Sequence, residues 1–193
     1  ERLAILEDAI SFLTSNGYEF IGMDHFAKPD DELAIAQREG ILHRNFQGYT
    51  TQGETDLLGL GVSSISQIGN AYSQNQKELK AYYEQVDELG HAQWRGVGLN
   101  DDDSIRRMVI KQLMCNFSLD KTKVEAEFDL DFDSYFAEDL QLLKSFIDDE
   151  LVLVEGKTLQ VAPKGKLLIR NICMCFDVYL RQRARQQQFS RVI

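Results

Sequence analysis

The chain has 193 residues, of which 44% are hydrophobic and 27% are charged. These values are typical of a globular protein with one domain, or with one large and one small part, and they argue against a disordered chain. Asp and Glu number 31 against 21 Lys and Arg, which gives a net charge of −10. We therefore expect no nucleic-acid partner and no general affinity for anionic membranes, because phosphates attract Lys and Arg.

The three cysteines favour a reducing compartment and argue against a disulfide framework. No apolar run approaches the roughly 20 residues that a membrane-spanning helix needs. We therefore expect a cytoplasmic protein without a membrane span. The chain begins with Glu1, inside an amphipathic pattern, and this suggests a piece of a longer protein.

The first hundred residues have the pattern of an α/β protein. Apolar residues at helical spacing predict a helix over residues 2–15, which ends at Asn16-Gly17. Residues 19–23 are predicted to form a short buried strand, and Pro29-Asp30-Asp31 predicts a second helix that ends at Gly40. Residues 57–68 can supply one or two strands, and residues 73–89 are predicted to form a helix.

A composition shift follows Trp94, and we place a domain boundary near residues 95 to 100. Helices are predicted over residues 100–115, 121–128 and 132–147, then a hairpin over 151–161 and a long helix over 166–185. Three helices, a hairpin and a helix predict a winged-helix-like module.

A glycine-rich polar loop, residues 46–56, is the most informative candidate for a binding site. Its glycines let the backbone approach a ligand closely, and its side chains are short hydrogen-bonding groups and amides. A structural loop between a helix and a strand explains the same pattern about equally well. The loop matches neither a Walker A motif nor a GxGxxG fingerprint.

Other candidates have simpler structural explanations. Cys173 and Cys175 point about 200° apart on a helix, so we predict structural packing and no metal site. His25 follows a strand, where a surface or capping role is favoured over a functional one. The helix over residues 133–147 carries Asp133, Glu138 and Asp139 against a lone Lys144, which disfavours DNA recognition. The residues alone identify no catalytic group.

Three segments resemble the oxygen-independent coproporphyrinogen III oxidase family, which are radical S-adenosylmethionine enzymes. These segments are GYEFIGMDHFAK at residues 17–28, HRNFQGYTT at residues 43–51, and the run from Leu167 to Ile193. The resemblance implies that residues 1–95 form the last part of an incomplete (β/α)6 TIM-like barrel, followed by a mostly helical domain with a β-hairpin over residues 96–193. It also implies oxidative decarboxylation of two propionates of coproporphyrinogen III, giving protoporphyrinogen IX in haem biosynthesis.

The same resemblance implies which cofactors and residues take part. The [4Fe–4S] motif has no counterpart in this chain, so the chain by itself is expected to be inactive. Gln47 and Ile65 match positions of a second S-adenosylmethionine site, with Phe46 as a secondary candidate for packing on the ligand. Arg181 and Arg185 are hypothetical partners of the substrate propionates. The intact enzyme is expected to be a monomer, while the piece is expected to self-associate.

Two alternatives stay open at this stage. One is the paralogous haem chaperone of the same superfamily, and the other is a winged-helix-like binding module without catalysis.

Overall fold

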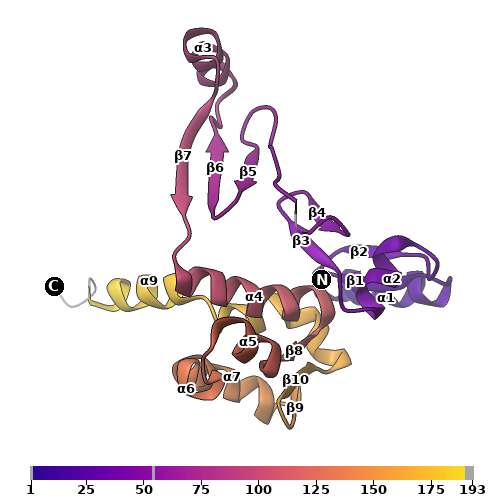
Figure 1. Ribbon diagram of the computed structural model, residues 1–193. Coiled ribbons are helices and arrows are strands. Elements are labelled where there is room, and N and C mark those ends of the chain that lie inside the picture. The colour runs from indigo at the N-terminus through magenta and orange to yellow at the C-terminus, as the bar shows by residue number, and fades with distance from the viewer. Residues whose placement is uncertain (1, 54, 190–193) are drawn as a thin grey trace. The chain divides into compact units, whose positions relative to one another are not determined.

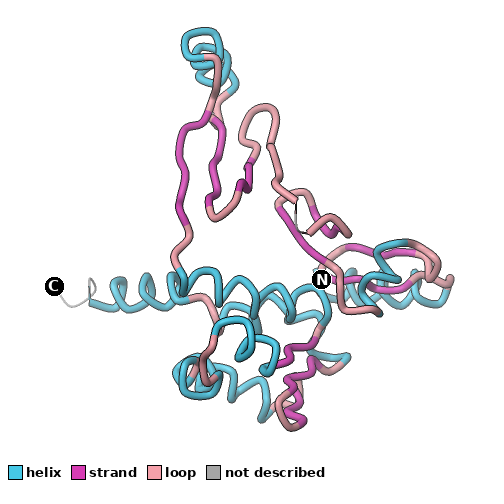
Figure 2. Tube along the Cα trace, viewed as in Figure 1, coloured by secondary structure: helices cyan, strands magenta, loops and turns pink. Residues whose placement is uncertain are grey.

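The computed structural model describes residues 2–53 and 55–189. The chain forms two compact units: unit 1 consists of residues 1–51 and 105–193, and unit 2 consists of residues 52–104. Helices dominate the segment after residue 100, while unit 2 is built mainly of strands and loops (Figure 2). The mixed α/β content expected from the sequence is therefore present. The division into residues 1–95 and 96–193 stays a prediction.

The first part of unit 1 consists of two helices and two short hairpins. It runs α1 (Arg2–Ser15), β1 (Glu19–Gly22), β2 (His25–Ala27), α2 (Glu32–Arg38), β3 (His43–Asn45) and β4 (Gly48–Thr50) (Figure 1). Helix α2 begins where the sequence predicts, because the Asp31 side chain accepts a hydrogen bond from the Leu33 amide at 2.9 Å. Strand β1 pairs antiparallel with β2, and β3 pairs antiparallel with β4.

A small core holds these elements together. Ile21, Ala34 and Leu42 are fully buried in it or nearly so, as is Cys115 from a later helix. The side-chain amide of Gln37 donates to the carbonyl oxygens of Ile21 at 2.6 Å and Cys115 at 2.7 Å. These two bonds tie β1 and the later helix to α2.

The second part of unit 1 surrounds the larger core. The chain continues through α4 (Asp101–Asn116), β8 (Ser118–Asp120), α5 (Lys121–Phe128), α6 (Phe132–Tyr135), α7 (Ala137–Asp148), β9 (Val152–Glu155) and β10 (Thr158–Val161). The three strands form an antiparallel sheet in the order β8-β10-β9. Phe132, Phe136 and Phe176 are fully buried where these helices meet. The predicted helices over residues 100–115 and 121–128 and the predicted hairpin are confirmed.

Two predicted helices are interrupted. The helix predicted over residues 132–147 divides into α6 and α7 at Phe136, whose backbone leaves the helical region so that its ring enters the core. The helix predicted over residues 166–185 divides into η1 (Pro163–Leu168), α8 (Ile169–Met174) and α9 (Val178–Phe189). Asp177 begins α9, because its side chain accepts from the amides of Tyr179 at 3.0 Å and Leu180 at 3.1 Å.

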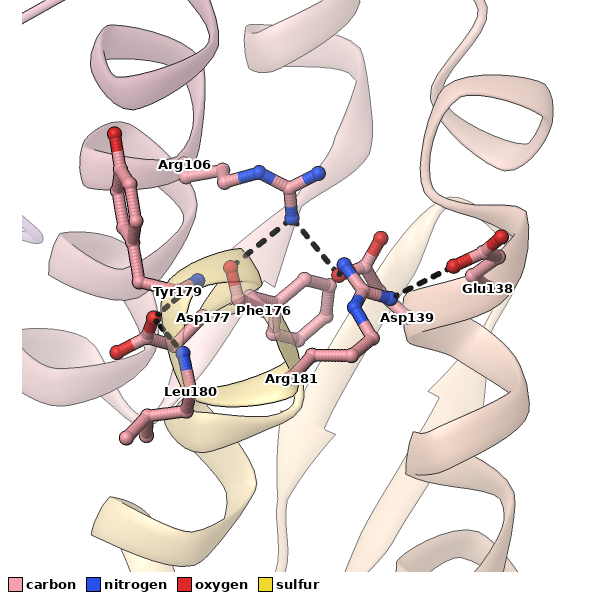
Figure 3. Close-up of polar contacts among 8 residues, drawn as sticks. All are labelled: Arg106, Glu138, Asp139, Phe176, Asp177, Tyr179, Leu180 and Arg181. Carbon is pink, nitrogen blue, oxygen red and sulfur yellow. Dashed lines mark hydrogen bonds and ion pairs between the residues drawn. The ribbon is translucent and has the colours of Figure 1, made fainter. Parts of the chain in front are cut away.

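A buried ion cluster fixes the start of α9 to α4 and α7. Asp139 on α7 accepts hydrogen bonds from Arg106 on α4 at 2.8 Å and from Arg181 on α9 at 3.0 Å (Figure 3). The same Nη1 atom of Arg106 donates to the Phe176 carbonyl oxygen at 3.0 Å. Only 2% of the Asp139 side chain is exposed, so solvent screens these charges little.

Unit 2 is a three-stranded antiparallel sheet with one helix. It consists of β5 (Ile65–Ile68), β6 (Ala71–Asn75), α3 (Leu79–Leu89) and β7 (Gln93–Gly98), with strand order β5-β6-β7. The helix predicted over residues 73–89 is wrong at its beginning, where residues 73–75 belong to the central strand β6. Pairing of Ser73 with both Ser66 and Gly96 overrides the local helical pattern. Among the hydrophobic side chains described in this unit, Ala92 alone is buried.

No helix within the described residues is both long enough and apolar enough to cross a bilayer.

Candidate functional site

The β3–β4 hairpin presents two of the three predicted site residues. Asn45 pairs with Gly48, so Phe46 and Gln47 form the two-residue turn between the strands. The Gln47 amide N–H donates to the Asn45 side-chain oxygen at 2.8 Å, which fixes the backbone of the turn. Both Phe46 and Gln47 are exposed. The side-chain amide of Gln47 makes no hydrogen bond to any described residue and is available to a ligand.

Tyr49 anchors this hairpin to the body of unit 1. Its hydroxyl donates to the Met114 carbonyl oxygen at 3.2 Å, and 8% of the residue is exposed. Burial raises the pKa of Tyr49 well above its usual value, so the hydroxyl stays protonated and continues to donate. The Arg44 guanidinium lies 5.1 Å from the ring centroid. Tyr49 therefore fixes the position of the β3–β4 hairpin, and with it the exposed turn.

His25 is a neighbour of the turn that the sequence did not identify as functional. Its ring packs edge-on against Tyr49 with centroids 5.1 Å apart, and its Nδ1 lies 2.9 Å from Asp24 Oδ1. A Cβ atom at Gly48 would lie 3.2 Å from His25 Nε2. The glycine thus permits the β1–β2 and β3–β4 hairpins to approach closely. No sequence spacing signalled this contact, because it joins two separate hairpins.

Ile65, the third predicted residue, belongs to unit 2. It is half-buried and begins β5, where it pairs with Gln74 of β6. The preceding glycine loop folds back onto it, and a Cβ atom at Gly59 would lie 2.7 Å from the Ile65 carbonyl oxygen. Asn75 holds this loop by donating to the Gly61 carbonyl oxygen at 3.0 Å. The segment is thus ordered by its own hydrogen bonds. Glu54, also in the polar loop, lies outside the described residues.

The three cysteines do not fit an iron–sulfur cluster. All three are buried, and burial raises the pKa of Cys115 and Cys173 to about 12 and that of Cys175 to about 11. A cluster ligand must be a thiolate, which these environments disfavour. The described residues contain no group of three or more His, Cys, Asp or Glu that could hold a metal. These observations agree with packing roles for the cysteines.

Of the two arginines hypothesised to hold substrate propionates, the structure describes the side-chain contacts of Arg181. Arg181 is bound to Asp139, lies 3.4 Å from Glu138, and exposes 14% of its side chain. It is therefore committed to the ion cluster. The Arg185 side chain and Arg191 lie outside the residues whose side chains the structure describes.

The helix that a winged-helix protein would use on DNA carries no uncompensated cation. Lys144 on α7 donates to both carboxylate oxygens of Asp148, at 2.7 and 2.9 Å. The remaining charges on α7 are acidic. This surface would repel phosphate.

Comparison with known proteins first shows which domain family and which solved structure the chain resembles. Residues 99–168 match the HemN C-terminal domain. A solved structure described as "Coproporphyrinogen III oxidase (HemN) from Escherichia coli is a Radical SAM enzyme" matches with a TM-score of 0.88 and 67% identity, over 92% of this chain and 41% of that chain.

Curated relatives then show which enzymes the whole chain is similar to. Oxygen-independent coproporphyrinogen III oxidases are similar to the whole chain: the Escherichia coli protein is 68% identical, the Synechocystis protein 53% and the Thermostichus vulcanus protein 50%. The chain spans 42%, 42% and 59% of the lengths of these relatives. The resemblance to the oxygen-independent coproporphyrinogen III oxidases is therefore confirmed over all 193 residues.

Proposed function

We propose that this chain is part of an oxygen-independent coproporphyrinogen III oxidase, which removes two propionate carboxyl groups of coproporphyrinogen III to give protoporphyrinogen IX. The observation that carries the proposal is 68% identity to the Escherichia coli enzyme across all 193 residues. The relatives named here from separate bacterial genera bear the same enzyme name. The proposal includes a cytoplasmic location and a monomeric enzyme.

The proposed architecture is a barrel segment followed by a winged-helix-like domain. The winged-helix-like part is supported by the element order α4, β8, α5, α6 with α7, β9, β10. Helices come first in this order, and the hairpin β9–β10 then completes the sheet β8-β10-β9. The shared fold with the Escherichia coli enzyme supports the first part. Within the described residues every strand pair is antiparallel, so parallel barrel strands would have to involve other parts of the protein.

Gln47 is the proposed polar contact to a second S-adenosylmethionine. Its amide has both donors and an acceptor free of other described residues, and the ligand offers a carboxylate and an amine. Phe46 beside it exposes 55% of its surface and can pack on the ligand. For Ile65, which belongs to unit 2, the proposed apolar or backbone contact rests on the family resemblance alone. The described residues offer no fitting ligands for the [4Fe–4S] cluster of the family, so none of its chemistry is assigned to them.

Anaerobic turnover tests the function and the site separately. The natural protein that carries this chain, supplied with S-adenosylmethionine and a reductant, should convert coproporphyrinogen III to protoporphyrinogen IX. The fluorescence of the oxidised porphyrin products measures this conversion. Gln47→Ala should raise the S-adenosylmethionine concentration needed for half-maximal rate at least 10-fold. Gln182→Ala, an exposed glutamine on α9, is the matched control and should leave it unchanged.

The outcomes distinguish the two parts of the proposal. Absence of turnover in the wild-type protein would contradict the function. Equal behaviour of Gln47→Ala and Gln182→Ala would remove Gln47 from the site and leave the function standing. Iron–sulfur reconstitution of the 193-residue chain alone should give a colourless product, and a brown product with cluster absorbance would contradict the assignment of the cysteines.

A further inference from the structure

A pocket within unit 1 lies apart from the β3–β4 turn and has no role in the proposed function. Its volume is about 340 Å³, within the range of small-molecule sites. Helix α1, strand β1 and the turn of η1 line it. Its walls include Ile10, Phe20 and Leu167, all half-buried, so most of its surface is apolar.

One cation in this pocket, Lys166, has no counter-ion among the residues that the structure describes. Lys166 is half-buried, and its ammonium forms no hydrogen bond or ion pair with any described residue. Its nearest described interaction is with the Phe117 ring, whose centroid lies 4.6 Å from Nζ. Burial lowers the pKa of Lys166, because the ammonium has lost water without gaining an opposite charge. A bound anion would compensate this loss.

Packed aromatic rings fix the position of Phe20 in the pocket wall. Phe20 stacks on Phe117 with centroids 6.3 Å apart, and Phe20 also contacts Phe26 at 5.4 Å. Phe117 is 2% exposed, so the base of the site is fixed before any ligand arrives. A preformed site loses less conformational entropy on binding than a flexible one.

The polar groups of the wall are few. Ser11 and Glu7 on α1 are both exposed and complete the polar part of the lining with Lys166. Glu7 makes no ion pair with Lys166 among the described contacts. A ligand for this wall therefore needs one negative group at Lys166 and an apolar remainder against Ile10, Phe20 and Leu167.

We propose that this pocket binds a small amphipathic carboxylate, with the carboxylate on Lys166 and the hydrocarbon part between α1 and β1. Neutral analogues would keep the apolar contacts and lose the ion pair, while a cationic analogue would be repelled. Octanoate, octanol and octylammonium are therefore a matched set of probes.

Isothermal titration calorimetry with the purified protein tests the charge requirement. Octanoate should bind with a Kd on the order of 1 mM or tighter, given its few heavy atoms, and octanol at least 10-fold more weakly. Octylammonium should not bind. The proposal would be overturned if octanoate at ten times this concentration did not bind. Equal affinity for octanoate and octanol would overturn it as well.

Two variants place the site on Lys166. Lys166→Met keeps the length of the side chain and should weaken octanoate at least 10-fold while leaving octanol unchanged. Lys164→Met is the matched control from the same turn, because the Lys164 ammonium points to Glu150 at 3.4 Å and does not line the pocket. Equal effects of the two variants would overturn the proposal, and thermal melts check that both remain folded.

A third variant locates the hydrocarbon part. Ser11→Phe on the exposed side of α1 should fill the pocket and abolish binding of octanoate and octanol alike. Retained binding in this variant would place the ligand elsewhere and contradict the proposal. As a spectroscopic readout, octanoate should raise the pKa of Lys166 in a titration of its side-chain carbon by NMR; an unchanged pKa contradicts direct contact.

Discussion

Replacing Asp139 with asparagine removes the charge that two arginines share in the core of unit 1. Arg106 and Arg181 donate to the same carboxylate oxygen at 2.8 and 3.0 Å, and 2% of the Asp139 side chain is exposed. Asparagine keeps the shape and one acceptor, so the change removes mainly the charge. Two arginines would then face a neutral amide, and the Glu138 carboxylate, which lies 3.4 Å from Arg181, is 70% exposed and compensates little.

The magnitude follows from the burial of the pair. A hydrogen bond to a charged group contributes about 1.5–3 kcal/mol, and breaking a buried ion pair costs about 3–5 kcal/mol. Because the remaining amide still accepts one bond, we expect Asp139→Asn to lower the free energy of unfolding by about 3 kcal/mol. Urea denaturation followed by circular dichroism measures this change, with an unchanged m-value as the sign that the folded state is otherwise intact.

A control on the same helix separates burial from charge alone. Asp148→Asn breaks the exposed pair with Lys144, whose side chains are 64% and 58% exposed, and should cost about 0.5 kcal/mol or less. Arg181→Met combined with Asp139→Asn should recover part of the lost stability, because one of the two cations that faced the lost charge is then gone. If Asp139→Asn costs no more than Asp148→Asn, the buried cluster does not stabilise the fold as argued.

Four further predictions concern the core thiols, a glycine and a buried hydroxyl. The three cysteines should resist iodoacetamide at pH 8 in the native protein and react fully in urea, since burial raises their pKa values to about 11 or 12; labelling of the native protein would contradict this. The pKa values of the thiols are higher in the folded than in the unfolded protein. Their contribution to the free energy of unfolding is therefore fully present below about pH 9 and should be lost as the pH rises toward 12. The midpoint of urea denaturation at each pH measures this loss. Gly59→Ala should disrupt unit 2, because the added Cβ would lie 2.7 Å from the Ile65 carbonyl oxygen. Gly98→Ala is the control, because a Cβ atom there meets nothing within 4 Å. Hydrogen exchange of the β5 amides should be faster in Gly59→Ala than in Gly98→Ala. Tyr49→Phe should cost about 1 kcal/mol by removing the bond to Met114, and a thermal melt that matches wild type would refute that role.

The sequence by itself determined the elements whose signals are local. The helix over residues 2–15 shows in its apolar spacing, and the hairpin over residues 152–161 shows in its alternation around Glu155-Gly156-Lys157. The start of α4 follows from a run of three aspartates, which lie in its first turn. Each of these elements depends on residues that are close in the sequence, so it can be predicted without knowledge of the fold. The family resemblance is likewise a property of the residue order.

Only the tertiary structure decided the features that depend on distant partners. Residues 73–75 become a strand because β5 and β7 pair with them on both sides, and the break at Phe136 exists because its ring is needed in the core. Arg181 could not be assigned to Asp139, nor His25 to Tyr49, from spacing. The candidate site shows the same division: the sequence supplied Gln47 through resemblance, while the fold supplied the exposed turn that leaves its amide available. Long-range contacts between side chains determine these outcomes, and a local pattern carries no information about them.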